Sequence, residues 1–194
     1  MDDTQLPASR ARALRQAIRG KYRGVARRPE GRFPYPVGRV SALRLGYTRE
    51  WIDAAPAPVL RRFVGVGNPF RARRPRAGER VLDLGCGAGF DVFVASLLVG
   101  ASGRAVGVDL ARRALRGTGH AEVRVARAER LPFEAASFDV VISNGALNLV
   151  PDKDAAFREA WRVLRPGGIF VAADLLVTEE VPAEVLADMD AWST

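Results

Sequence analysis

A glycine-rich turn in the middle of the chain is the first feature that could do chemistry. It reads VLDLGCGAGFD from Val81 to Asp91 and joins a short apolar segment to a helical one. Glycines at such a turn let the backbone approach a ligand where a Cβ atom would collide. The dinucleotide fingerprint needs a small residue at the third glycine of G-x-G-x-x-G counted from Gly85, and that position is Phe90. The turn therefore favours a nucleoside cofactor other than NAD.

A second acidic residue, Asp109, closes the next apolar segment, 26 positions after Asp83. The carboxyl ends of parallel strands meet at one edge of a sheet, so Asp109 is expected beside the glycine turn, where it can accept hydrogen bonds from both ribose hydroxyls. The alternative is a helix N-cap, because a helix is expected to follow. In combination with the glycine turn, ribose binding is favoured.

Short apolar runs alternate with helical stretches from Arg80 onward, which predicts an α/β fold: a Rossmann-like, doubly wound parallel sheet of about five strands. Strands are expected at 80–84, 104–108, 122–126, 138–143 and 168–175. Helices are expected at 88–99, 110–116 and 152–164, and from 182 to about 189. This core should cover 77–194, behind a basic helical lid segment, 1–76, with helices at 8–28, 48–55 and 58–64.

Charge is unevenly spread along the 194 residues: the formal net charge is +8, but 1–80 alone carries 19 Lys and Arg against 6 Asp and Glu. Such a front half fits either nucleic acid as a partner or a solvated arginine-rich face. No apolar run is long enough to span a bilayer and the amino terminus lacks a signal peptide, so a cytoplasmic protein without membrane partners is expected. One cysteine and one histidine exclude a zinc site.

Further motifs follow in order: LPF at 131–133, FDVVISN at 138–144 and RVLRPGG at 162–168. With the glycine turn and Asp109, they resemble the ordered motifs of class I S-adenosylmethionine-dependent methyltransferases. Within that superfamily the chain is most similar to arsenite methyltransferase-like proteins. That similarity is carried by LGY at 45–47, GNP at 67–69, GFD at 89–91 and SNGALNLVPDK at 143–153, and it extends over nearly the whole chain.

The resemblance implies S-adenosylmethionine as the cofactor and a small molecule as the methyl acceptor. Methyl transfer depends mainly on positioning, which explains why no catalytic side chain stands out. The implied cofactor-binding residues run from the amino-acid part, through the ribose and adenine, to the methyl-donating end: Asp83, Gly85, Cys86 and Gly87; then Asp109, Leu110, Ala128 and Glu129; then Ser143, Asn144 and, closing over the site, Asn68.

The sequence departs from the family pattern in its candidate arsenic ligands. Arsenite methylation in that family depends on separated cysteines, since thiolates are soft ligands. Two of the family's cysteine positions are Val66 and Gly145 here, and Cys86 belongs to the glycine turn. This departure from the family pattern disfavours arsenic as the substrate. Arg127 stands where the family usually has an acidic residue for the adenine amino group.

The resemblance runs to Thr194, whereas relatives continue into further strands, so a chain truncated at its C-terminus is expected. Without the family's C-terminal antiparallel strand pair, strand 168–175 would be an open apolar edge, which favours a homo-oligomer through that edge or low stability. Two functional alternatives stay open: a non-catalytic degenerate relative, and a nucleic-acid-binding methyltransferase that uses the basic arm.

Three side chains also carry expectations of their own. Trp161 is expected in the core because helix 152–164 is amphipathic. Tyr47 fits either the site or the packing of the arm. Asp174 is expected to cap a turn.

Overall fold

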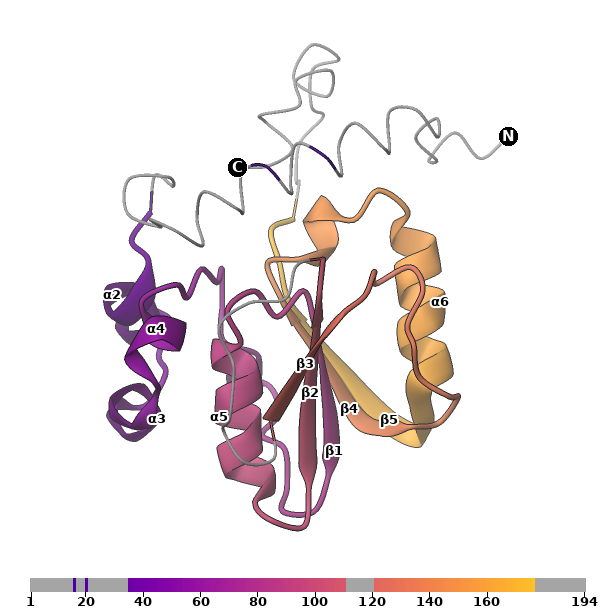
Figure 1. Cartoon of the computed structure of the whole chain (residues 1–194), viewed down its shortest axis with the longest axis horizontal. Helices are drawn as coiled ribbons and strands as arrows, with labels where there is room; N and C mark the ends of the chain where they lie inside the picture. Colours follow the sequence, from indigo (N-terminus) through magenta and orange to yellow (C-terminus); the bar gives the residue numbers. More distant parts are fainter. Residues whose placement is uncertain (1–15, 17–19, 21–34, 111–120, 177–194) are drawn as a thin grey trace.

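The structure is a computed structural model that describes residues 16, 20, 35–110 and 121–176. Five strands form one all-parallel sheet in the order β3-β2-β1-β4-β5 (Figure 1). The strands are β1 (Arg80–Leu84), β2 (Arg104–Asp109), β3 (Ala121–Val125), β4 (Phe138–Asn144) and β5 (Leu164–Ala173). This confirms the predicted fold class. The expected helices 8–28, 110–116 and 182–189 lie wholly or almost wholly outside the described residues.

The central strands are apolar because helices cover both faces of the sheet. Successive side chains of a strand point to opposite faces, and β1 divides accordingly. Val81 packs with the cluster that contains helix α5 (Phe90–Val99), whereas Leu82 packs with the cluster that contains helix α6 (Lys153–Val163). Figure 1 shows α5 and α6 on the two sides of the sheet.

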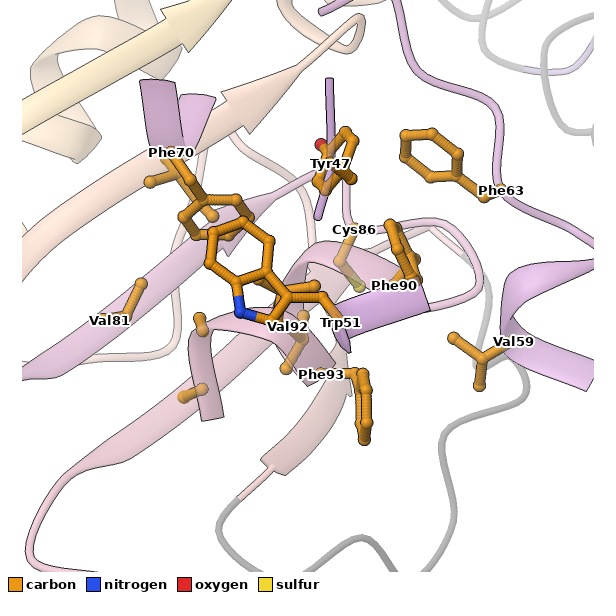
Figure 2. Packing of buried hydrophobic residues seen from close by; sticks show 14 of the residues in the cluster. Tyr47, Trp51, Val59, Phe63, Phe70, Val81, Cys86, Phe90, Val92 and Phe93 are labelled. Atoms are coloured by element: carbon orange, nitrogen blue, oxygen red, sulfur yellow. The ribbon is translucent and has the colours of Figure 1, made fainter. Parts of the chain in front are cut away.

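Three short helices pack outside α5 and enclose an aromatic cluster (Figure 2). They are α2 (Gly38–Arg44), α3 (Arg49–Ala54) and α4 (Ala57–Leu60), followed by the 3-10 turn η1 (Pro69–Arg71). The Tyr47 and Phe63 rings lie 5.1 Å and 4.7 Å from the ring of Phe90, the first residue of α5. The part of the amino-terminal segment from residue 35 onward therefore shares a core with the sheet.

Strand β5 begins four residues earlier than its Pro-Gly-Gly sequence suggested. Leu164 pairs with Phe138, and regular pairing resumes at Val140 and Ile169 after a register shift. Gly167 takes a φ of 74° within the extra residues, a conformation that glycine adopts without strain. The register shift therefore lets the strand include residues before 168, where the expected strand began.

The core prediction for Trp161 is wrong, since its side chain is 81% exposed. The inward face of α6 is made instead by Ala156, Ala160 and Val163. Among the described residues, every helix is too short or too polar to cross a bilayer.

Gly107 lies in β2 directly under the glycine turn, where there is no room for a side chain. A Cβ atom there would lie 2.6 Å from both the Cys86 Sγ and the Val92 Cγ2 atoms. We expect Gly107→Ala to lower the free energy of unfolding by about 1–3 kcal/mol, the usual cost of overpacking a core. Urea denaturation measures the loss.

Adding Val92→Ala removes one of the two clashing side chains. The double variant should therefore lose less stability than the sum of the two single variants. Additive losses would show that the Gly107 contact is not the cause.

Candidate functional site

The glycine turn follows β1 and leads into α5 with a tightly fixed backbone. The amides of Gly85 and Cys86 donate to the carbonyl oxygen of Val108 at 2.8 Å and 3.0 Å, which holds the turn against the end of β2. Gly87 has a φ of 52°, and a Cβ atom built on it meets nothing within 4 Å. Hydrogen bonds therefore fix the turn on the side that faces β2. The backbone of Gly87 is accessible on the other side, where a ligand could approach it.

Asp83, on the penultimate residue of β1, is a buried carboxylate with an unsatisfied oxygen. Asp83 is only 3% exposed, and its Oδ2 atom lacks a hydrogen-bond partner among the described residues. Burial, followed by repulsion from Asp91 and Asp109, raises its pKa well above the usual value. An unsatisfied buried carboxylate is costly, and a ligand that supplies donors or positive charge would offset that cost.

Asp109 lies where the sequence analysis placed it, at the carboxyl end of β2 beside the glycine turn. Its Oδ2 atom accepts a hydrogen bond from the Gly87 amide at 3.1 Å. Leu110 follows directly and is partly buried. The structure thus brings Asp83, Asp109 and the glycine turn together at one edge of the sheet.

A third carboxylate, Asp91, belongs to the same group although it had no assigned role. It is 5% exposed on the first turn of α5. Its Oδ1 atom accepts from the Tyr47 hydroxyl at 2.6 Å and its Oδ2 atom accepts from Asn144 Nδ2 at 3.0 Å. Burial raises the pKa of Asp91 to about 6, although these two hydrogen bonds act in the opposite direction.

Asn144, the last residue of β4, connects this group to the loop 65–68. Its Oδ1 atom accepts from the amides of Val66 and Gly67 at 3.0 Å and 3.1 Å, and its Nδ2 atom donates to the Gly67 carbonyl at 2.9 Å. The side-chain amide is thereby engaged with protein groups on both its ends. The structure gives Asn144 the role of fixing this loop over the edge of the sheet.

Close approach of several chain segments around this loop depends on glycine. A Cβ atom on Gly67 would lie 2.7 Å from the Ala173 Cβ atom, and one on Gly145 would lie 3.2 Å from the Val66 Cγ1 atom. A Cβ atom on Gly85 would collide with the Ala146 side chain. Loop 65–68, the glycine turn, the residues after β4 and the end of β5 therefore meet at one place.

The other predicted site residues occupy more varied positions. Ser143 is fully buried and its hydroxyl donates to the Leu84 carbonyl at 3.2 Å. Asn68 caps η1 by accepting from the Phe70 amide. Ala128 and Glu129 form the two-residue turn of a small antiparallel bridge and are partly buried. The structure gives these side chains structural contacts, and their contact with a cofactor remains a prediction.

Cys86 contributes its backbone to the turn, while its thiol packs inward. The residue is 9% exposed, and burial raises the thiol pKa well above its usual value. Such a thiol is held in its protonated, poorly nucleophilic form.

Asp174 accepts from the amides of Leu147 and Asn148 at 2.8 Å and 3.2 Å. These hydrogen bonds confirm that it caps a turn, here η2 (Leu147–Leu149).

Sequence reasoning missed Asp91 and left Tyr47 undecided. The available signal was the position of Asp91 in the first turn of the helix that follows the glycine turn, where it faces back toward the strand edge. Tyr47 is 3% exposed, and it fills both suggested roles because its ring packs on Phe90 while its hydroxyl reaches Asp91. The resulting group of carboxylates favours a ligand that carries positive charge.

Comparison with known proteins gives this geometry a context. The family described as "Methyltransferase domain" matches residues 75–194. An arsenite methyltransferase of Halobacterium salinarum is 40% identical over 158 residues, which cover 76% of this chain and 40% of that protein. The mouse arsenite methyltransferase is 31% identical over 172 residues, covering 75% of this chain and 43% of that protein. The chain thus spans about two fifths of the length of these curated relatives.

Among solved structures, an arsenic(III) S-adenosylmethionine methyltransferase from Chlamydomonas reinhardtii is similar, with a TM-score of 0.63 and 35% identity. The match covers 72% of this chain and 52% of that one. A methyltransferase from Aquifex aeolicus, at 20% identity and a TM-score of 0.51, shares the fold.

Asp83→Asn should stabilise the ligand-free protein at pH 7.5, because it removes a buried charge that has an unsatisfied oxygen. In the wild type the folded-state pKa values of Asp83 and Asp91 lie above their unfolded values, so folding takes up protons and stability rises as the pH falls from 7.5 to 5. The expected rise is on the order of 1–2 kcal/mol, and Asp83→Asn should reduce it. Urea midpoints measured at each pH test this.

Carboxylates paired with arginine act in the opposite direction but at lower pH. The pKa values of Glu79, Glu122, Asp139 and Glu159 are lowered by arginine contacts, so the stability they confer is lost mainly below about pH 4.5. The exposed Asp154→Asn variant is the matched control and should leave both quantities unchanged. A destabilised Asp83→Asn protein at pH 7.5 would contradict this reading of the site.

Proposed function

Because the chain belongs to the methyltransferase-domain family, we propose that it binds S-adenosylmethionine at the glycine turn and methylates a small-molecule acceptor other than arsenite. The observation that carries the proposal is the unsatisfied Oδ2 atom of buried Asp83 beside the open backbone of Gly87. The relatives named above support the cofactor, since one is described as an S-adenosylmethionine methyltransferase.

The charge of the described residues fits this cofactor. S-adenosylmethionine carries a sulfonium and an ammonium group against one carboxylate, so its net charge is positive. The causes that shift the pKa values of Asp83 and Asp91 include burial, other acids and neutral donors, and no basic side chain of the described residues is among them. A net positive ligand would supply the compensation that this part of the chain lacks.

Each residue then has a distinct task. Asp83 and the backbone of Gly85, Cys86 and Gly87 hold the amino-acid part, and Asp109 accepts from the ribose hydroxyls. Leu110, Ala128 and Glu129 would flank the adenine. Asp109 and the turn are joined by the bond from the Gly87 amide, so the two parts of the binding surface are set relative to each other before a ligand arrives.

Held by Asp83, the glycine turn and Asp109, the cofactor would supply an electrophilic methyl group for transfer to a lone pair of the acceptor, and its sulfur would be left as a neutral thioether. The chain contributes position and exclusion of water. Loop 65–68, fixed by Asn144, would form one wall of the acceptor site, with Asn68 at its far end and Ser143 and Asn144 behind it.

Two other readings remain as competing outcomes. A degenerate relative would fold without binding the cofactor. A methyltransferase that uses the basic segment 1–76 on nucleic acid would bind duplex DNA with an affinity that falls steeply with salt. The division into a lid at 1–76 and a core at 77–194 is likewise part of the proposal.

Calorimetry with S-adenosylmethionine and S-adenosylhomocysteine tests the cofactor proposal. The product lacks the sulfonium charge, so the site should bind the substrate form about tenfold more tightly at low salt, since a unit charge near buried carboxylates is worth about 1–2 kcal/mol. Asp83→Asn should weaken both ligands and bring their ratio towards one. Asp109→Ala should weaken both equally, because both carry the ribose.

Absence of binding by the folded wild type would favour the degenerate reading and overturn the proposal. Equal or tighter binding of S-adenosylhomocysteine would contradict the charge argument while leaving cofactor binding intact.

Cysteine variants at positions 66 and 145 test the proposal that arsenite is not the acceptor. The wild type should neither bind nor methylate arsenite, because Cys86 is the single cysteine and its thiol is buried. Positions 66 and 145 are in contact, so the Val66→Cys/Gly145→Cys double variant should bind phenylarsine oxide through both thiols, far more tightly than either single variant. Fluorescence competition with a free dithiol measures this binding.

Circular dichroism checks that the double variant folds, since Gly145 has a φ of 66°. Methylation of arsenite by the wild type would overturn this part of the proposal.

A further inference from the structure

The surroundings of the Asn144 side chain specify one of the two orientations that its amide group can take. Its Oδ1 atom accepts from two backbone amides of loop 65–68. Its Nδ2 group faces three oxygen atoms: a carbonyl of the same loop at 2.9 Å, the Tyr47 hydroxyl at 3.1 Å and Asp91 Oδ2 at 3.0 Å. A rotated amide would place its oxygen against the Asp91 carboxylate and its donors against the loop amides. The charge of Asp91 therefore selects the orientation that holds the loop.

Hydrogen atoms and acceptors match in this network when Asp91 is ionised. The Tyr47 hydroxyl donates to Asp91 Oδ1 at 2.6 Å, and the two hydrogens of the Asn144 amide go to Asp91 Oδ2 and to the Gly67 carbonyl. Protonation of Asp91 would add a hydrogen that the Tyr47 oxygen must accept. The Tyr47 proton would then turn to the Gly67 carbonyl, 3.4 Å away. Hydrogen bonds to an ionised acceptor are about twice as strong as neutral ones, so loss of the Asp91 charge weakens the anchor of Asn144.

Asp91 lies within electrostatic reach of the proposed cofactor site. It is on the first turn of α5, directly after the glycine turn, and its charge contributes to the raised pKa of Asp83. The titratable groups in this part of the molecule come from β1, β2, the glycine turn and the segment between α2 and α3, and all are acids: Asp83, Asp109, Cys86 and Tyr47. A cationic ligand at the turn would therefore be attracted to Asp91 as well as to Asp83.

We propose that Asp91 passes the charge of the ligand to loop 65–68 through Asn144, and that it thereby acts as a positioning residue of the site. A cationic ligand keeps Asp91 ionised, the carboxylate orients Asn144, and the oriented amide holds the loop. S-adenosylhomocysteine keeps the ammonium group but lacks the sulfonium charge, so the loop is held less firmly once the methyl group has left. The ligand step rests on the proposed function, whereas the relay from Asp91 to the loop can be measured without a ligand.

Amide hydrogen exchange, followed residue by residue by NMR, tests the relay in the ligand-free protein. The protection factors of the Val66 and Gly67 amides should fall about fivefold from pH 7.5 to pH 5, because Asp91, with a pKa of about 6, becomes neutral. Global stability should rise over the same range, so unfolding cannot cause this fall. Constant protection would overturn the proposal, as would protection that rises at low pH because Tyr47 has turned to Gly67.

Two variants distinguish the relay from a merely structural role. Asp91→Asn cannot titrate, so the protection of the two loop amides should be low and independent of pH. Tyr47→Phe removes a hydrogen bond that lowers the pKa of Asp91, so the midpoint of the fall should move to higher pH. A structural role alone would lower protection and leave the midpoint in place, which would refute the relay even if Asp91→Asn failed to fold. The exposed Asp154→Asn variant on α6 is the matched control and should behave as the wild type.

Saturation with each cofactor form tests the ligand step. At pH 6, S-adenosylmethionine should protect the two loop amides about threefold more than S-adenosylhomocysteine, because only the sulfonium keeps Asp91 fully ionised. At pH 8 the two forms should protect them equally, since Asp91 is then ionised with either. Equal protection at pH 6, or a difference of the same size at pH 8 or in Asp91→Asn, would contradict the transfer of charge.

Calorimetry on the same samples keeps the two proposals separate. A protein that binds neither form would refute the proposed function, and the ligand-free pH series would still decide whether Asp91 controls the loop. A protein that binds both forms but shows pH-independent protection of Val66 and Gly67 would refute the relay and leave cofactor binding intact.

Discussion

The side-chain amide of Asn144 holds together the parts of the molecule that make a site possible. It stands at the end of the buried strand β4 and makes bonds to Asp91 and to both sides of loop 65–68. An amide has both donors and acceptors, so it can bridge a carboxylate and a peptide unit at once. Loop 65–68 carries no regular secondary structure of its own between α4 and η1, and Asn144 makes three hydrogen bonds to its backbone.

The buried carboxylates Asp83 and Asp91 place uncompensated negative charge at the carboxyl edge of the sheet. Burial of the Asp83 and Asp91 carboxylates costs free energy, and the neutral partners Tyr47 and Asn144 offset that cost only for Asp91. This arrangement is poor for stability and well suited to selection of ligands, because an anion or a neutral nucleotide would leave the deficit in place. In the proposed site, the charge of a ligand would therefore matter as well as its shape.

The sequence predicted the sheet, the glycine turn and the place of Asp109, because strand periodicity and turn chemistry are local properties. It did not predict the role of Asp91 or Asn144, since their hydrogen bonds join segments that lie 44 to 97 positions apart in the chain. Trp161 was misread for a related reason. A helical pattern identifies an apolar face, but only the packing shows that small residues, Ala156 and Ala160, face the sheet and that the tryptophan lies outside it.

The hydrogen bonds between Asn144 and loop 65–68 also bear on how fast this loop opens and closes. Their formation closes a stretch of almost eighty residues, so it carries the entropic cost of a long loop closure. These bonds lie outside the hydrophobic core, so the loop can open through breakage of a few hydrogen bonds without disruption of the core. Opening of loop 65–68 would then be a local event. The residence time of a ligand bound beside this loop would depend on how fast the Asn144 side chain releases the amides of Val66 and Gly67.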